Sequence, residues 1–247
     1  MYNPFLLEGK TILITGASSG IGQTTAIECS KMGGTVIITA RNKERLMHTF
    51  DQMEGSGHQM ILADLTNEDN IEELAEKCPK IDGLVNNAGV ASNKPVAFFS
   101  QKELDKVYSA NTYAPMLTIR WLLKQKKLNN NGSIVFTASV ASICSTLSNG
   151  IYGSSKAAIA AYMKYCAREL ASKGIRANAV HPGMVETKLI HGGAYSEEDL
   201  SNDLKNYPLG RYGKPEEIAY AIIYLLSDAS SWTTGISLFV DGGCTLQ

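Results

Sequence analysis

Short apolar runs alternate with helix-length segments along the whole of this 247-residue chain. Each run holds five to seven residues and many are rich in β-branched side chains, which is typical of a buried strand. Strands that alternate with helices are joined by right-handed crossovers into a mostly parallel sheet. The sequence therefore predicts an α/β fold: a doubly wound, seven-stranded parallel sheet with helices on both faces, in one domain spanning residues 1–247. The runs are Thr11–Thr15, Thr35–Ala40, Gln59–Asp64, Ile81–Asn86, Ser133–Ala138, Ile175–His181 and Ile236–Val240.

Three segments between the runs carry further signals. Ser100 and Glu103 have the spacing of a capping box, which predicts the start of a helix. Asn129–Asn131 predict a surface turn before the fifth strand. The stretch 187–213 is polar, contains glycines and has no strand pattern. Because long irregular segments between core elements are usually functional, we expect a substrate lid at 187–213.

The composition argues against several classes of partner. A net charge of −1 gives no electrostatic reason to expect binding to nucleic acid or to an anionic membrane. No run of 18 apolar residues occurs and the N-terminus lacks a basic segment, so we expect neither a membrane span nor a signal peptide. The five cysteines are scattered and the four histidines lack metal-ligand spacing. We therefore expect free thiols, a cytoplasmic location and no metal site.

The segment TILITGASSGIG, residues 11–22, predicts a strand, a turn with three glycines and a helix. Glycines let a backbone approach a pyrophosphate, and the helix N-terminus offers free N–H groups and the positive end of its dipole. The spacing of Gly16, Gly20 and Gly22 differs from G-x-G-x-x-G, and the loop lacks the Gly-Lys-Ser/Thr of nucleoside-triphosphate sites. We interpret it as a dinucleotide-binding loop; the alternative is a tight turn without a ligand.

The end of the second predicted strand indicates which dinucleotide is bound. An acidic side chain there favours NAD because it binds the ribose 2′-hydroxyl, whereas an arginine suits the 2′-phosphate of NADP. The chain carries Ala40 at the expected acidic position, followed by Arg41. The sequence therefore predicts a preference for NADP(H), with NAD(H) as the alternative. Arg41 could instead be a solvated residue that opens the next helix.

Tyr152 and Lys156 lie one helical turn apart in GIYGSSKAAIAAYMKYCARELASKGI, residues 150–175. The spacing alone means little, because a chain with this many tyrosines and lysines contains such a pair by chance. A phenol with a pKa of about 10 is a poor base at neutral pH, and a neighbouring ammonium lowers that pKa. The pair is therefore a candidate for general acid–base chemistry if the surrounding motifs support it.

The motifs together resemble those of the short-chain dehydrogenase/reductase family, in its compact, Rossmann-like form, over nearly the whole chain. TGASSGIG (15–22) is similar to the cofactor loop of the family, NNAG (86–89) to the motif after the fourth strand, and YGSSK (152–156) to its Tyr-x-x-x-Lys pair. Ser139 precedes Tyr152 by thirteen residues, as in the family, and Asn111 is placed like its fourth catalytic residue. HPGMVET (181–187) resembles the segment that closes over nicotinamide, and GRYGKPEEIA and VDGG (240–243) complete the series.

The resemblance implies an enzyme that interconverts a carbonyl and a secondary alcohol with a nicotinamide cofactor. Tyr152 would be the general acid in reduction and the base in oxidation, Ser139 would hold the substrate oxygen, and Lys156 would also bind the nicotinamide ribose. Asn111 would support a water-linked proton relay to Lys156. His181 falls where the family has no catalytic residue and is expected to be structural. The other implied cofactor contacts are Gly16, Ser18, Ser19, Gly20, Ile21, Arg41, Asp64, Leu65, Asn87, Ala88, Gly89, Pro182, Gly183, Val185 and Thr187.

The resemblance to 3-oxoacyl-[acyl-carrier-protein] reductases implies a 3-oxoacyl thioester as the first candidate substrate, with a carrier-bound acyl chain as a partner. Lys173 could meet an acidic carrier near the active-site mouth, but Asn130 stands where a basic residue is expected. Sugar, polyol, steroid or xenobiotic carbonyl compounds remain alternatives, because a fold does not settle a substrate.

Two other classes of protein fit the sequence less well. A non-catalytic nucleotide-binding protein usually lacks part of the catalytic set, whereas all four positions are filled here. A nucleotide-sugar epimerase or dehydratase would need a sizeable C-terminal substrate domain. The C-terminal SLFVDGGCTLQ resembles a segment that packs between subunits, which implies a homotetramer.

Overall fold

The computed structural model describes residues 2–187 and 197–246. Its sheet has seven parallel strands in the order β3-β2-β1-β4-β5-β6-β7, which confirms the predicted doubly wound topology. The chain winds in opposite directions from β1, so the switch point between β1 and β4 is the expected ligand crevice. The strands are β1 (Thr11–Thr15), β2 (Thr35–Ala40), β3 (Gln59–Leu62), β4 (Ile81–Asn86), β5 (Leu128–Thr137), β6 (Arg176–Pro182) and β7 (Ser237–Val240).

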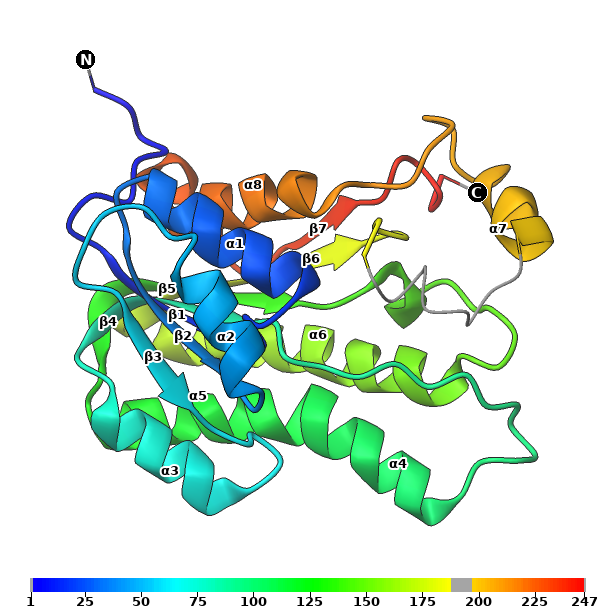
Figure 1. The fold of residues 1–247 in the computed structure, drawn as a ribbon, viewed down its shortest axis with the longest axis horizontal. Helices are drawn as coiled ribbons and strands as arrows, with labels where there is room; N and C mark the ends of the chain where they lie inside the picture. Colours follow the sequence, from blue (N-terminus) through cyan, green and yellow to red (C-terminus); the bar gives the residue numbers. More distant parts are fainter. Residues whose placement is uncertain (1, 188–196, 247) are drawn as a thin grey trace.

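Helices cover both faces of the sheet, with α1, α2 and α8 on one side and α3, α4, α5 and α6 on the other (Figure 1). Side chains alternate along β1: Leu13 packs into the apolar cluster with α3, α5 and α6, whereas Ile12 and Ile14 pack into the cluster with α1 and α8. The strands are thus buried on both faces, as parallel sheets require. The helices are α1 (Gly20–Lys31), α2 (Lys43–Phe50), α3 (Glu68–Lys77), α4 (Gln101–Tyr108), α5 (Ala114–Lys124), α6 (Gly150–Leu170), α7 (Glu197–Leu204) and α8 (Pro215–Leu226), with short helical turns η1 (Ser109–Tyr113), η2 (Val140–Ser142), η3 (Ala171–Lys173) and η4 (Asp228–Ser230).

Strand β5 differs from its predicted extent. It begins at Leu128, five residues before the expected start, because Leu128 already pairs with Ile81 of β4. The register then shifts before Gly83, so Asn129–Asn131 form an irregular insertion within the strand rather than a separate turn. Asn131 has a φ of 62°, a left-handed conformation that asparagine adopts more readily than most residues.

The path from α4 to α5 runs through a π-helical turn, η1, which the sequence did not predict. Ser100 caps α4 as expected, since its Oγ accepts from the Glu103 N–H at 3.2 Å. The Glu103 carboxylate accepts instead from the Ser92 hydroxyl at 2.8 Å, so the second capping-box bond is replaced by a link to the preceding loop. Pro115 has no N–H to donate to the Asn111 carbonyl four residues earlier, which disfavours regular α-helical bonding there. Such π turns are frequent at functional sites.

The predicted lid, 187–213, is described only in part, because residues 188–196 lie outside the described residues. The described part contains α7, and Val185 forms an isolated parallel bridge with Gly213. This bridge ties the chain entering the segment to the chain leaving it.

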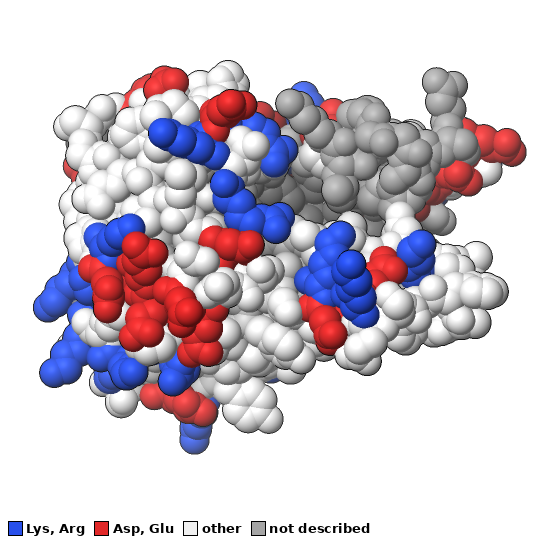
Figure 2. Space-filling model, turned by 60° about the horizontal axis from the view of Figure 1, so that its bottom comes forward, with Lys and Arg blue, Asp and Glu red and all other residues white. Residues whose placement is uncertain are grey.

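The surface carries charges of both signs. On the face drawn in Figure 2, basic and acidic side chains lie beside one another with uncharged surface between them. This arrangement agrees with the net charge of −1. No helix within the described ranges is long and apolar enough to cross a membrane.

Candidate active site

The glycine loop and the NNAG motif meet at the carboxyl edge of the sheet, at the switch point between β1 and β4. Gly16 follows β1 and has a φ of +67°, which only glycine adopts without strain. A Cβ atom at Gly16 would lie 2.7 Å from the Cα atom of Ala88. The close approach of the two loops therefore depends on the absence of a side chain at residue 16.

Asn87 braces this junction. Its backbone N–H and that of Ala88 donate to the Thr15 hydroxyl at 3.0 and 3.1 Å, and its Nδ2 atom donates to the Thr15 carbonyl at 3.2 Å. The Asn87 side chain, from a residue expected to contact the cofactor, is therefore engaged with β1. Ala88 supplies backbone and a methyl group to the same junction.

The N-terminus of α1 points into the crevice beside the glycine loop. Ser19, the residue before α1, is extended, and its side chain makes no capping hydrogen bond to the helix. The first-turn N–H groups near Gly20 and Ile21 therefore lack a side-chain cap, and Ser18 lies in the same loop. A free helix N-terminus beside a glycine turn fits the pyrophosphate of a dinucleotide.

The segment after β6 closes over this loop. A Cβ atom at Gly20 would lie 3.4 Å from Thr187 Cγ2, so Thr187 is in contact range of the α1 N-terminus. The segment is held by the Met184 N–H, which donates to the Tyr207 hydroxyl at 2.8 Å. Nothing in the sequence pointed to Tyr207. Pro182 ends β6, Gly183 donates to Val240, and Val185 is buried in the core.

The residues expected to contact the adenosine half of the cofactor follow β2 and β3. Arg41 directly follows β2 and is exposed, and no described carboxylate forms an ion pair with it. Asp64 accepts hydrogen bonds from the backbone and hydroxyl of Thr66, which fixes the turn after β3. The Leu65 side chain is packed in the core. Arg41 is thus available to bind a phosphate.

Tyr152 and Lys156 lie in the first two turns of α6, as predicted from their spacing. The Lys156 side chain is buried, and its Nζ atom donates a 2.7 Å hydrogen bond to the Thr137 carbonyl. The same atom lies 5.9 Å from the centre of the Tyr152 ring. Burial lowers the pKa of Lys156 to about 8, so the ammonium is retained at neutral pH but is close to losing its proton.

Asn111 lies in η1 and is buried. Its Oδ1 atom accepts from the Val90 N–H at 2.8 Å, and its Nδ2 atom donates to the Val90 carbonyl and the Ser155 hydroxyl at 3.0 Å each. A Cβ atom at Gly89 would lie 3.0 Å from Asn111 Oδ1 and 3.4 Å from Lys156 Nζ. The side chain therefore clamps the NNAG segment. The side-chain amide is engaged, so a proton relay at Asn111 would have to use its main-chain carbonyl. Pro115 has no N–H to donate to that carbonyl.

Ser155 is the buried residue in this group that the sequence analysis missed. Its hydroxyl donates to the Tyr152 carbonyl at 2.7 Å and accepts from Asn111, so it connects η1 with α6. Its position inside YGSSK, between the tyrosine and the lysine, was a signal that could have singled it out.

Ser139 follows β5 and begins the turn η2, which packs against the first turn of α6. A Cβ atom at Gly153 would lie 2.6 Å from the Ala141 carbonyl oxygen, so glycine lets this turn approach the helix that carries Tyr152. The Ser139 hydroxyl accepts from the Ala141 N–H at 3.1 Å. Its own hydrogen remains able to donate to a substrate oxygen.

The described residues contain no cluster of three or more His, Cys, Asp or Glu that could hold a metal ion. The donors assembled at the carboxyl edge are backbone N–H groups, hydroxyls and one ammonium. Such a set suits an anionic, hydrogen-bonding cofactor better than a cation.

The fold and this site define a dinucleotide-dependent oxidoreductase. A family model described as enoyl-(acyl carrier protein) reductase matches residues 16–245. The chain is 36% identical to the 3-oxoacyl-[acyl-carrier-protein] reductase FabG of Thermotoga maritima, over 97% of this chain and 99% of that protein. The chain belongs to the short-chain dehydrogenase/reductase family.

Solved structures agree with this assignment. A protein described as a short-chain alcohol dehydrogenase from Sinorhizobium meliloti 1021 has a TM-score of 0.92 and 30% identity, over 99% of this chain and all of that one. A protein described as a 2-deoxy-D-gluconate 3-dehydrogenase from Agrobacterium tumefaciens, with bound NADP, has a TM-score of 0.89 and 31% identity, over the full length of both chains. The protein is therefore an NAD(P)-dependent oxidoreductase.

Proposed function

We propose that this protein uses NADP(H) to interconvert a carbonyl and a secondary alcohol, and that its substrate is a 3-oxoacyl thioester. The observation that carries the proposal is the buried Lys156 ammonium beside Tyr152, within the same helix and next to the turn that bears Ser139. An ammonium near a phenol makes proton exchange with an alkoxide favourable near neutral pH.

In the direction of reduction, a nicotinamide cofactor held by the glycine loop and Lys156 would supply the hydride for the carbonyl carbon. The Ser139 hydroxyl donates a hydrogen bond to the carbonyl oxygen and stabilises the negative charge that develops there. Tyr152 transfers its phenolic proton to that oxygen, which leaves a phenolate beside Lys156. Oxidation of the alcohol reverses these steps, with the Tyr152 phenolate accepting the hydroxyl proton.

The preference for NADP(H) is supported by Arg41. Its exposed guanidinium follows β2 directly and has no described ion-pair partner, so it is free to bind a 2′-phosphate. Ala40 offers no carboxylate to a ribose 2′-hydroxyl. The bound NADP in the Agrobacterium tumefaciens neighbour is consistent with this preference.

An acyl substrate is favoured over a sugar by the apolar side chains around the site. Val96 and Phe98, in the loop that leaves the carboxyl end of β4, are 86% and 77% exposed. Ile143 and Leu147, in the loop that leaves the carboxyl end of β5, are 62% and 98% exposed. Parallel strands bring these loops to one edge of the sheet, and exposed apolar side chains gathered at such an edge would suit an apolar ligand. The FabG relative carries 3-oxoacyl reductase in its name.

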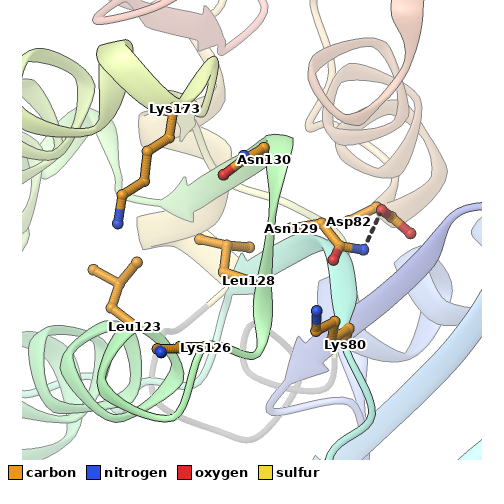
Figure 3. Close-up of a pocket in the computed structure, with 8 residues that line it drawn as sticks. All are labelled: Lys80, Asp82, Leu123, Lys126, Leu128, Asn129, Asn130 and Lys173. Carbon is orange, nitrogen blue, oxygen red and sulfur yellow. Dashed lines mark hydrogen bonds between the residues drawn. The ribbon is translucent and has the colours of Figure 1, made fainter.

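The position of Lys173 limits which active site an acidic carrier protein bound there could serve. Lys173 and Asn130 line a hollow of about 670 Å³ together with Lys80, Lys126 and Asp82 (Figure 3). This hollow lies at the amino ends of β5 and β6, whereas Tyr152 lies at the other end of α6. Since α6 has 21 residues, the two ends are about 30 Å apart. An acidic carrier bound at Lys173 would therefore serve the site of another protomer.

We accordingly propose that the protein assembles as a homotetramer and works in the cytoplasm. Trp232 is fully exposed and Phe239, on the edge strand β7, is 37% exposed, which supports burial of this edge between subunits. All five cysteines are free thiols, which suits a reducing compartment. Light scattering at micromolar concentration tests the assembly, and a monomeric mass would contradict it.

The substrate proposal is tested with purified protein by the loss of reduced-nicotinamide absorbance. NADPH is offered with acetoacetyl thioesters, diketones, sugars and steroids, with Tyr152→Phe as the control. We expect turnover of the thioester that the variant loses. Turnover of sugars alone would replace the acyl substrate with the sugar alternative. NADPH binding without turnover of any compound would favour a non-catalytic nucleotide-binding protein.

A further inference from the structure

His181 makes contacts that the proposed chemistry does not use. It lies in β6 and is only 2% exposed. Its Nδ1 atom is 3.1 Å from the Ser139 carbonyl oxygen and 3.0 Å from the Ser142 hydroxyl. The Ser142 hydroxyl also donates to the Ser139 carbonyl at 2.7 Å. Because a carbonyl oxygen only accepts, the hydrogen of the neutral imidazole is on Nδ1.

The imidazole is held in one orientation, and its surroundings favour the neutral form. The ring of Phe239, the residue paired with His181 across β6 and β7, lies 4.7 Å from the imidazole centre. Burial lowers the pKa of His181. The hydrogen bond to Ser139 raises this pKa, and the positive charge of Lys156 lowers it further. A second proton would sit on Nε2, which is buried and has no hydrogen-bond partner among the described residues.

We propose that His181 is a positioning residue for Ser139, an inference that rests on the proposed function of Ser139. Two donors, His181 Nδ1–H and the Ser142 hydroxyl, fix the carbonyl of Ser139 at the start of η2. The Ser139 hydroxyl is fixed by the Ala141 N–H in the same turn. The orientation of the hydroxyl toward the substrate therefore depends on the strand-end histidine, 42 residues away in sequence.

The proposal is tested by two substitutions at residue 181 with opposite chemistry. His181→Phe keeps a planar ring but removes the Nδ1–H donor, whereas His181→Asn places an amide N–H near the position of Nδ1–H. Loss of one hydrogen bond that orients a catalytic group is expected to lower kcat roughly tenfold in His181→Phe. His181→Asn should stay within about threefold of the wild type, because it preserves the donor. KM for the substrate and Kd for NADPH should change little in both variants.

The decisive comparison repeats both substitutions in a Ser139→Ala background. If His181 acts through the Ser139 hydroxyl, His181→Phe has no further effect on kcat once that hydroxyl is gone. The same tenfold loss in both backgrounds would overturn the proposal and assign His181 a general structural role. Equal losses in His181→Phe and His181→Asn would also overturn it.

Two controls keep the test interpretable. His58 also makes two backbone contacts, to Val36 and Glu54, but lies before β3 at the amino end of the strands. His58→Phe should leave kcat unchanged. Should His181→Phe not fold, Ser142→Ala removes the other donor to the same carbonyl and should lower kcat in the same Ser139-dependent way. Wild-type activity in Ser139→Ala would contradict the proposed function itself. If Ser139→Ala loses activity but the variants at His181 and Ser142 keep the wild-type kcat, only this inference is contradicted.

Discussion

Lys156 Nζ donates a 2.7 Å hydrogen bond to the carbonyl oxygen of Thr137, the last residue of β5. The bond joins the helix that carries Tyr152 to the strand that leads into Ser139. The lysine is therefore both a structural link between the two groups and the charge beside the phenol. Its burial lowers its pKa to about 8, which affects both the pH dependence of catalysis and the stability of the fold.

The rate of carbonyl reduction is expected to fall as the pH rises through about 8. Above this pH Lys156 loses its proton, and the phenol of Tyr152 loses the positive charge that favours proton transfer to the substrate. A pH–rate profile of kcat checks this. In Lys156→Arg, whose guanidinium stays charged, the decline near pH 8 should be absent even if the overall rate is lower. A decline with the same midpoint in that variant would assign it to another group.

Replacing Lys156 by methionine is expected to stabilise the fold while abolishing activity. The folded-state pKa of about 8 lies below the ordinary value of 10.5, so the buried charge destabilises the fold below pH 8. Because the unfolded chain binds more protons between these two values, the wild type gains stability as the pH rises through that window. We expect Lys156→Met to be more stable by about 1–3 kcal/mol at pH 7.

Urea unfolding of the wild type and of Lys156→Met at pH 7 and pH 9.5 measures this effect. The stability advantage of the variant should shrink at pH 9.5, where the lysine of the folded wild type is neutral. A stability advantage that grows with pH would contradict a lowered pKa of Lys156 in the folded state.

Gly16 and Gly9 form a matched pair for testing the contact between the two cofactor loops. Both have a left-handed φ, +67° and +73°, but a Cβ atom at Gly9 would have no atom within 4 Å. Gly9→Ala should cost about 1 kcal/mol of stability from backbone strain alone and leave NADPH affinity unchanged. Gly16→Ala adds the clash with Ala88, so we expect a further loss of about 1–3 kcal/mol and a large loss of NADPH affinity. Denaturant unfolding and NADPH titration measure the two quantities. Equal stability and equal NADPH affinity in Gly9→Ala and Gly16→Ala would contradict this prediction.

Arg41 is expected to set the cofactor preference. Arg41→Ala should weaken NADPH binding by roughly 10- to 100-fold, the value of one or two charge-assisted hydrogen bonds, and leave NADH binding nearly unchanged. Fluorescence titration with both cofactors checks the prediction. Arg168→Ala, an exposed arginine in the last turn of α6, serves as the control and should alter neither affinity. Unchanged NADPH affinity in Arg41→Ala would remove the basis for the NADP(H) proposal.

The parts of the fold that local sequence patterns determine could be predicted. The bounds of β1, β2 and β4 match their apolar runs, because each run is buried on both faces and ends at a turn-forming segment. β5 was predicted too short, since the pairing of Leu128 with Ile81 across an insertion is a tertiary contact that no local pattern reveals.

The candidate site could likewise be predicted only in part. Helical spacing placed Tyr152 and Lys156 on one helix face, and the surrounding motifs made the pair a catalytic candidate. The role of the Asn111 side chain could not, because it depends on the π-helical turn and on Val90, 21 residues away. The bond from His181 to Ser139 likewise forms only when β5 and β6 lie side by side. Contacts between distant segments are set by packing, and these are what the sequence analysis missed.

Proton transfer from Tyr152 to the substrate oxygen is tested by single-turnover kinetics. Enzyme saturated with NADPH is mixed with acetoacetyl thioester, and the loss of reduced-nicotinamide absorbance is followed for the wild type and for Tyr152→Phe. If Tyr152 donates this proton, the variant should keep an unchanged Kd for NADPH and show a hydride-transfer rate at least roughly 100-fold lower. A Tyr152→Phe rate close to that of the wild type would show that Tyr152 is not the proton donor.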